Sequence, residues 1–445
     1  MDRLPRPHAR RVRHAALRAR RRDPPSGGGV HGRGQAHEAD LARDPRGRGG
    51  ARVPVAADRR AQPRVPRPRR RRRGDRLPRG RAPAPAAVRQ RPGQRVVRPP
   101  GRLVSAHVTS VREGVERGAE PLAQVVRGDV VESVHTGHLV LLDADGAPLL
   151  ERGDPDAVIW PRSSVKPFQA VAMLRHGLVL PPRLLALAAA SHNGEREHLA
   201  GVREILASAG LDESALRNTP DMPLHPPAAF AWQVEGNGPS SITQNCSGKH
   251  AAMLATCVAA GWDTTGYLEV DHPLQVAVRE AVAEATGQAV EHVTVDGCGA
   301  PLFSTTVRGL ARAFGRLAAA PERDPRSPEA QVARAMAAFP EMVGGTGRDA
   351  TLAMRAVPGL VAKDGADGVY GAGLPDGRSL AFKVLDGASR PRPPVLAEAL
   401  RRLGALDVDG ADDVALAALG DAPVLGAGRP VGAVRAVLDG AEGHP

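Results

Sequence analysis

The sequence contains little cysteine, few aromatic residues and no long apolar run. Three of its 445 residues are cysteine, and aromatic side chains make up 2% of the total. Three cysteines cannot form the disulfide framework of a small secreted scaffold. No run of about 18 apolar residues occurs, as a membrane-spanning helix would need, and no apolar signal-peptide segment follows the basic N-terminus. We therefore expect a cytoplasmic protein without membrane contacts.

Lysine is also scarce, whereas arginine supplies nearly all of the other positive charge. The only lysines are Lys166, Lys249, Lys363 and Lys383. Either residue can serve as a surface cation, but only lysine can lose its proton and act as an amine base. Three of the four lie in the unusual motifs described below, which makes them candidates for chemistry. The alternative is that an arginine-rich coding composition left four lysines by chance.

The charge is divided unequally between two parts of the chain. Residues 1–102 contain 31 arginines and 7 acidic residues, whereas residues 103–445 contain 30 basic and 41 acidic residues. The first part is rich in arginine, proline and glycine and has too little apolar content to bury a core. We predict a disordered leader over 1–102, a linker over 103–121 and a folded domain over 122–445. Nucleic acid is a partner only through the leader, whose arginines would attract phosphate.

Strand and helix patterns alternate within the folded domain. Residues 130–143 are rich in β-branched side chains, and a turn at 143–146 leads into a second strand. A proline-rich loop is expected over 219–241. Strands at both ends of the domain with helices between them predict a mixed α/β fold with a largely antiparallel sheet. Helices are expected near 163–173, 184–190, 195–209, 247–260, 272–286, 305–319, 328–338 and 394–403, and further strands near 293–295, 359–364, 369–374 and 379–385.

The segment PRSSVKPF places Ser163 one helical turn before Lys166. Ser163 or Ser164 suits a helix N-cap, and Pro167 is tolerated only in a first turn. Residues i and i+3 share a helix face, so the Ser163 hydroxyl and the Lys166 amine can meet. A neutral lysine can take the proton of a serine, which makes this pair a candidate for nucleophilic catalysis. Because the motif is short, many basic helix starts produce it by chance.

Cysteine, lysine and aspartate form a second constellation, in QNCSGKH and DGCGAP. Cys246 and Cys298 lie at turns and could bind zinc as thiolates, with Lys249 as a neutral amine and Asp296 nearby. Alternatively, the cysteines are small buried residues, or the helix start at 247–250 binds an anion. His250 could be a base, a ligand or a hydrogen-bonded residue of the helix start. The spacing alone leaves these interpretations open.

Two further polar segments are candidates for the wall of a substrate pocket. Ser191, His192 and Asn193 follow a short apolar helix, which suits a polar wall beside a buried core. No Gly-x-Ser-x-Gly elbow supports a serine–histidine–carboxylate triad at Ser191. The loop GGTG around Thr346 lacks the lysine of a nucleotide-binding loop. It suits either a close backbone approach to a small polar substrate or a flexible turn.

Taken together, the motifs resemble the bacterial L-asparaginase II family, typified by thermolabile and Rhizobium-type inducible asparaginases. They occur in family order over residues 120–440, whereas the arginine-rich leader has no counterpart. The family's fold is similar to that of serine β-lactamases and glutaminases. The matching segments are RGDVVESVHTGHLVLLD, RSSVKPFQA, SHNGE, CSGKHAAMLA, DGCGAP and GTGRDATLAMRAVPGLVAKDGADGVYGAGLPDGRSLAFKVLDG.

The resemblance implies two serine–lysine pairs in one active site. The first pair falls on Ser163 and Lys166, and the second on Ser191 and Lys363. One serine would attack the side-chain carboxamide of L-asparagine and release ammonia, and water would then release L-aspartate. Which serine attacks is open, with Ser191 slightly favoured. An alternative is another serine acyl-transfer enzyme on the same scaffold, such as a glutaminase or a β-lactamase-like enzyme.

The resemblance also implies a zinc site and substrate contacts. The zinc ligands fall on Cys246, Lys249 and Cys298, with Asp296 near the metal-bound water. Zinc could orient the substrate or act in catalysis. Arg162 could face the α-carboxylate of the substrate, or be an exposed arginine beside the helix start. His192, Asn193 and Thr346 are further candidate contacts, and we expect a homodimer.

Overall fold

The computed structural model describes residues 114–439. The predicted leader over 1–102, with any nucleic-acid contact that it makes, lies outside the described residues. The first strand, β1 (Glu120–Arg127), starts inside the predicted linker and is hydrogen-bonded to two neighbours. No helix in the described part of the chain is both long enough and apolar enough to cross a membrane.

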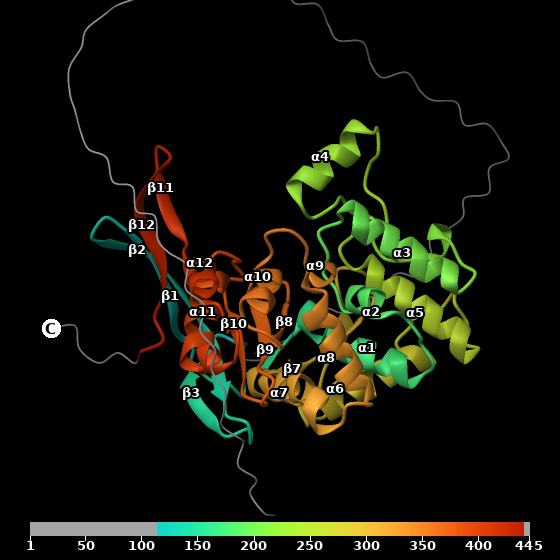
Figure 1. The fold of residues 1–445 in the computed structure, drawn as a ribbon, viewed down its shortest axis with the longest axis horizontal. Helices are drawn as coiled ribbons and strands as arrows, with labels where there is room; N and C mark the ends of the chain where they lie inside the picture. Colours follow the sequence, from blue (N-terminus) through green and yellow to red (C-terminus); the bar gives the residue numbers. More distant parts are fainter. Residues whose placement is uncertain (1–113, 440–445) are drawn as a thin grey trace, which may run out of the picture. The chain divides into compact units, whose positions relative to one another are not determined.

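An antiparallel sheet of eight strands forms one layer of this domain (Figure 1). The strands follow the order β11-β12-β1-β2-β10-β9-β8, and β3 pairs with β2 outside this path. This confirms the predicted mixed α/β fold with a largely antiparallel sheet. Beyond β1, the strands of the sheet are β2 (Val130–Leu142), β3 (Pro148–Arg152), β8 (Val361–Asp364), β9 (Val369–Gly373), β10 (Ser379–Val384), β11 (Pro423–Gly426) and β12 (Arg429–Ala436).

The long strand β2 holds the sheet together because different strands pair with its two halves. Val134 lies opposite Gln124 of β1, whereas Leu141 lies opposite Leu380 of β10. The second half of β2 is buried throughout, in keeping with its apolar sequence. The N-terminal β1 pairs directly with the C-terminal β12, and β2 lies between this pair and the hairpin of β9 and β10.

Helices cover the sheet and form a second layer beside it. Helix α7 packs against β9 and β10, where Gly371 and Gly373 leave room for Phe314. A Cβ atom at Gly371 would lie 2.3 Å from the Phe314 ring, so glycine is required there. The helices are α1 (Lys166–Arg175), α2 (Pro182–Ala188), α3 (Arg196–Ser208), α4 (Pro226–Val234), α5 (Ser247–Ala260), α6 (Pro273–Thr286), α7 (Val307–Arg323), α8 (Pro328–Ala338), α9 (Pro340–Val343), α10 (Asp349–Ala356), α11 (Arg392–Arg402) and α12 (Asp413–Gly420).

Two local predictions were wrong. The segment 219–241 contains helix α4 instead of only a loop, because Pro226 is at the first helical position, where proline is tolerated. Neither Ser163 nor Ser164 caps a helix. A 3₁₀ turn (Arg162–Val165) comes first, α1 begins at Lys166, and the Ser164 hydroxyl donates to the Pro161 carbonyl instead.

Several segments that are far apart in the sequence meet where the helical layer reaches β8. Helices α1, α2 and α5 pack against one another, and the 3₁₀ turn before α1 contacts β8. The N-terminal ends of α1 and α5 and the loop after α2 therefore lie near the lysine-bearing strand β8. Two short strands, β5 (Val293–Val295) and β6 (Pro301–Phe303), carry the turn with Asp296 and Cys298.

Candidate active site

Lys166 lies at the centre of the site and contacts Ser191 instead of Ser163. Its Nζ atom lies 3.0 Å from Ser191 Oγ, 2.6 Å from the Ala190 carbonyl oxygen and 3.1 Å from Cys246 Sγ. Lys166 is 1% exposed and Ser191 is 4% exposed, so both are shielded from bulk water. The helix start presents the amine, and the loop after α2 presents the hydroxyl.

Ser163 is placed differently from what its spacing suggests. The 3₁₀ turn removes the regular i, i+3 geometry of an α-helix, on which the predicted contact with Lys166 depended. Among the described residues, Ser163 has no side-chain hydrogen bond. Its side chain is half-buried, while the fully buried Ser164 next to it bonds to its own turn.

His192 fixes the shape of the loop that carries Ser191. Its Nδ1 accepts a hydrogen bond from the Gly194 amide, so Nε2 carries the proton and donates to Ser247 Oγ at 2.9 Å. Burial holds the pKa of His192 well below its usual value, so the ring is neutral. With both ring nitrogens bonded inside the protein, His192 positions the loop and has no nitrogen left for a substrate.

Asn193 connects this loop to the glycine-rich loop around Thr346. Its Nδ2 donates to Glu195 Oε1 and to the Thr346 carbonyl, both at 3.0 Å. Gly345 packs directly against the Asn193 side chain with a φ of +110°, which explains the glycine. The Thr346 amide donates to Glu195 Oε1, and its side chain is exposed. The glycine-rich loop is thus anchored to the serine loop through Asn193 and Glu195.

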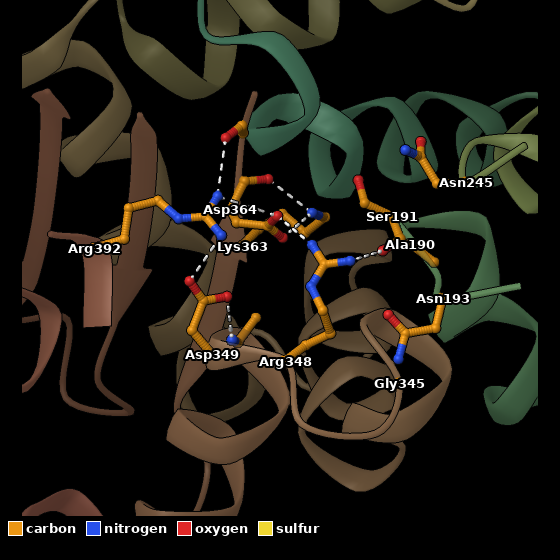
Figure 2. Close-up of polar contacts among 12 residues, drawn as sticks. Ala190, Ser191, Asn193, Asn245, Gly345, Arg348, Asp349, Lys363, Asp364 and Arg392 are labelled. Carbon is orange, nitrogen blue, oxygen red and sulfur yellow. Dashed lines mark hydrogen bonds and ion pairs between the residues drawn. The ribbon is translucent and has the colours of Figure 1, made fainter. Parts of the chain in front are cut away.

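Lys363 approaches the site from β8 and is held by its neighbour Asp364 (Figure 2). Its Nζ atom lies 2.6 Å from Asp364 Oδ1 and 2.7 Å from the Asp364 carbonyl oxygen. Lys363 is fully buried, and burial lowers its pKa to about 8, although the charge of Asp364 opposes this shift. No direct hydrogen bond joins Lys363 to Ser191 within residues 114–439, so the implied second pair is not hydrogen-bonded here.

Charged residues that sequence reasoning did not single out surround Lys363. Arg348 donates to Asp364 Oδ2 at 2.5 Å and to the Ser191 carbonyl oxygen at 3.1 Å. Arg392 pairs with Asp349 Oδ2 at 3.0 Å. These residues come from the starts of α10 and α11 and the end of β8, so only the fold reveals the cluster (Figure 2). In the sequence, the only sign of this cluster was the charged residues in the strings RD and VAKD, which lie within the segments that resemble the family.

The two cysteines and Lys249 of the second constellation do come together. Lys249 Nζ lies 3.2 Å from Cys298 Sγ, and the Cys246 and Cys298 side chains pack in one small buried cluster. The hydrogen bond from Cys246 and the charge of Lys249 lower the pKa of Cys298 to about 5, against the effect of burial. The same hydrogen bond, together with burial, raises the pKa of Cys246 to about 12. Cys298 therefore loses its proton more readily than Cys246.

These donors fit a soft metal ion such as zinc. Thiolates are strong zinc ligands, and a bound cation favours the deprotonated forms of thiol and amine. The neighbouring His250 has a buried Nε2 atom without a hydrogen-bond partner, while its Nδ1 lies 2.8 Å from the Tyr267 hydroxyl. No group of three His, Cys, Asp or Glu side chains between residues 114 and 439, the cysteine cluster included, has a metal-binding arrangement. A metal site at this cluster therefore needs Lys249 as a ligand in addition to the two cysteines.

Arg162 and Asp296 form an ion pair at the outer edge of the cysteine cluster. Arg162 Nε lies 2.8 Å from Asp296 Oδ1, and the guanidinium also pairs with Asp367. The hydrogen bond from Arg162 and the charge of Lys249 lower the pKa of Asp296 against the effect of burial. On its other side Arg162 lines a cavity of about 610 Å³, together with Trp160 and other residues. Arg162 therefore already contacts two carboxylates.

Comparison with known proteins identifies the family. A profile of the L-asparaginase II family matches residues 123–436. The chain belongs to the L-asparaginase II family. The match includes every serine, lysine and cysteine of the site, which makes the chain a member of an amidohydrolase family. No curated protein matches the chain.

Solved structures similar to this L-asparaginase II family member include two β-lactamases. One, from Mycobacterium bovis, is 17% identical, with 60% of this chain and 94% of that chain covered and a TM-score of 0.35. A putative β-lactamase from Bacteroides dorei is 15% identical, with 60% and 93% covered and a TM-score of 0.35. A third protein, Mglu in its tris and glutamate form, is 16% identical, with 66% and 65% covered and a TM-score of 0.30.

Proposed function

We propose that the protein hydrolyses L-asparagine to L-aspartate and ammonia, with Ser191 as the nucleophile and Lys166 as its base. The observation that carries the proposal is the 3.0 Å contact between Lys166 Nζ and Ser191 Oγ in a buried site. A serine is a weak nucleophile until an adjacent base takes its proton. Membership of the L-asparaginase II family supports the choice of an amide as substrate.

In the first half of the reaction, Ser191 Oγ bonds to the carboxamide carbon of L-asparagine while its proton passes to Lys166 Nζ. The oxygen of the amide becomes an oxyanion in the tetrahedral intermediate. Lys166 then gives the proton to the amide nitrogen, the carbon–nitrogen bond breaks, and ammonia leaves. The product of this half is an ester between Ser191 and the side chain of the substrate.

In the second half, water attacks the ester carbon and the bond to Ser191 Oγ breaks. We assign Lys363 to this step because its buried amine has a pKa of about 8 and can accept a proton from water near neutral pH. Ser191 Oγ leaves with a proton relayed from Lys363 through Lys166, which contacts it, so both amines return to their starting state. The remaining proton of the water is lost when the new carboxylic acid ionises, and L-aspartate leaves. Asp364 orients Lys363 through the hydrogen bond at 2.6 Å.

We further propose that Cys246, Lys249 and Cys298 hold a zinc ion. When bound, the ion supplies a positive charge beside the site that can orient a polar substrate. Its position is linked to the reacting groups because Cys246 Sγ lies 3.1 Å from Lys166 Nζ. The homodimer and the cytoplasmic location remain predictions.

Ammonia release from L-asparagine by the purified full-length protein, supplied with zinc, tests the proposal. We expect ammonia and L-aspartate in equal amounts, with L-glutamine measured in parallel as the competing substrate. Folded, zinc-loaded protein that releases no ammonia from L-asparagine would show the proposal to be wrong. Ammonia release from L-glutamine but not from L-asparagine would mean that L-glutamine is the substrate, with the reaction type unchanged.

A further inference from the structure

We infer that Arg348 binds the α-carboxylate of the amino-acid substrate. This inference rests on the proposed function, since it assigns the recognition of a substrate that the proposed reaction requires. It also departs from the sequence-based expectation, which gave this contact to Arg162.

The cluster around Lys363 contains three basic groups and two carboxylates, so it carries excess positive charge while Lys363 is protonated. Lys363, Arg348 and Arg392 surround the carboxylate of Asp364, and Asp349 is the second acid of the cluster. Burial raises the pKa of Asp349, although the charge of Arg392 opposes this shift. Buried charges need partners because desolvation is costly. A ligand carboxylate would restore the balance.

Of the three arginines near the site, Arg162, Arg348 and Arg392, Arg348 has the least neutralised guanidinium. Arg162 contacts two carboxylates, those of Asp296 and Asp367. Arg392 pairs with Asp349 and lies 3.6 Å from Asp364. Within the described residues, Arg348 pairs with only one carboxylate, and this one is shared with Lys363.

Arg348 is also the arginine positioned beside the proposed nucleophile. Its second hydrogen bond goes to the neutral carbonyl of Ser191 at 3.1 Å. Figure 2 shows the guanidinium between Ser191 on one side and Lys363 with Asp364 on the other. The side chain is 16% exposed, compared with 7% for Asp364, so a small ligand can reach it. Asp364 holds the guanidinium in place for this contact.

The short separation between the carboxamide and the α-carboxylate of L-asparagine suits this contact with Arg348. In L-asparagine only the short Cα–Cβ link separates the carboxamide carbon from the α-carboxylate. A carboxamide at Ser191 Oγ therefore leaves the α-carboxylate within reach of a side chain that contacts the backbone of Ser191 itself. Arginine suits a carboxylate because its planar fork can donate two parallel hydrogen bonds.

Calorimetric titration of the product L-aspartate into the zinc-loaded full-length protein tests this inference separately from catalysis. The comparison ligand is 3-aminopropanoate, which is L-aspartate without its α-carboxylate. We expect Arg348→Gln to weaken L-aspartate binding by on the order of 10- to 100-fold, the range of a charge-assisted hydrogen bond. Binding of 3-aminopropanoate should change little. The matched control is Arg355→Gln, which removes an exposed arginine of the same helix.

Steady-state kinetics adds a second readout. Arg348→Gln should raise KM for L-asparagine by a similar factor and change kcat less, and Arg348→Lys should give an intermediate KM. If Arg348→Gln does not fold, Arg348→Lys provides both measurements. Unchanged L-aspartate binding and unchanged KM in a folded Arg348 variant would overturn the inference. Absence of ammonia release by the wild type would instead refute the proposed function, and the titration would still test the carboxylate contact.

Discussion

Lys166 Nζ lies 3.0 Å from Ser191 Oγ, although the two residues belong to different motifs. The short-range partner suggested by spacing, Ser163, has no such contact because a 3₁₀ turn precedes α1. The loop after α2, locked by His192, brings Ser191 to the amine instead. This one relationship keeps Ser191 as the favoured nucleophile but makes Lys166, instead of Lys363, the lysine beside it.

Ser191→Ala should lower kcat/KM for ammonia release by at least about 1,000-fold, because it removes the nucleophile. Ser163→Ala should cause a much smaller loss, on the order of tenfold, since Ser163 does not contact Lys166. Both variants should unfold at nearly the wild-type temperature. A larger effect of Ser163→Ala than of Ser191→Ala would reverse the assignment.

The pH dependence of kcat should report Lys363. Because burial disfavours the ammonium form, the pKa of Lys363 is lowered to about 8. Below that pH the amine is protonated and cannot accept a proton, so kcat should rise with pH and level off above about 8. Lys363→Ala should lower kcat and remove this rising limb of the pH profile. Lys383→Ala, which changes the only lysine outside the site, should retain the limb. A limb that persists in Lys363→Ala would contradict the assignment.

Asp364→Asn should destabilise the fold as well as the site. The substitution leaves the buried Lys363 and Arg348 without their shared carboxylate, a loss of about 3–5 kcal/mol in the free energy of unfolding. Asp376→Asn is the matched control, since Asp376 forms a half-exposed ion pair with Arg378 and should cost less than about 1 kcal/mol. Denaturant unfolding of both variants checks this. Equal losses would mean that the buried cluster contributes no more than a surface pair.

Gly345→Ala should disturb the site more than Gly347→Ala. Both glycines have positive φ, but a Cβ at Gly345 would lie 2.6 Å from Asn193 Nδ2, whereas a Cβ at Gly347 meets nothing within 4 Å. We expect a loss of about 1–2 kcal/mol for Gly347→Ala from backbone strain alone, and a larger loss for Gly345→Ala. Urea unfolding measures both. The idea that the two loops are locked together fails if the variants are equally stable.

Cys298→Ser should abolish stoichiometric zinc binding. Cys298 supplies one of the two thiolates of the proposed ligand set, and a hydroxyl is a much weaker zinc ligand. Cys257→Ser is the matched control, because Cys257 lies in the core within α5, away from the other two cysteines. Metal analysis after extensive dialysis should find about one zinc per chain in the control and almost none in Cys298→Ser. Equal zinc contents would remove Cys298 from the ligand set.

The sequence predicted most elements of the domain because their patterns are local. The β-branched run of β2 and the hairpin of β9 and β10 are confirmed almost to the residue. Strand β1 was not predicted, because its short mixed sequence becomes a strand only between β2 and β12. Helix α4, which has no buried residue, lacked the apolar face that identifies a helix.

The same distinction applies to the site. The scarcity of lysine correctly directed attention to Lys166, Lys249 and Lys363, which are almost fully buried. Lys166 pairs with Ser191 and not with Ser163 because a 3₁₀ turn precedes α1, and residue spacing does not reveal that turn. Arg348 could not be singled out because the chain is rich in arginine, and only its contacts with Ser191 and Asp364 distinguish it.

The most direct measurement is the site of the covalent intermediate. The full-length, zinc-loaded protein is mixed with L-asparagine, quenched in acid within the first turnover, digested and analysed by mass spectrometry. We expect an adduct with the mass of L-asparagine less ammonia on Ser191, and no such adduct in Ser191→Ala. An adduct on Ser163, or ammonia release by Ser191→Ala at the wild-type rate, would contradict this expectation.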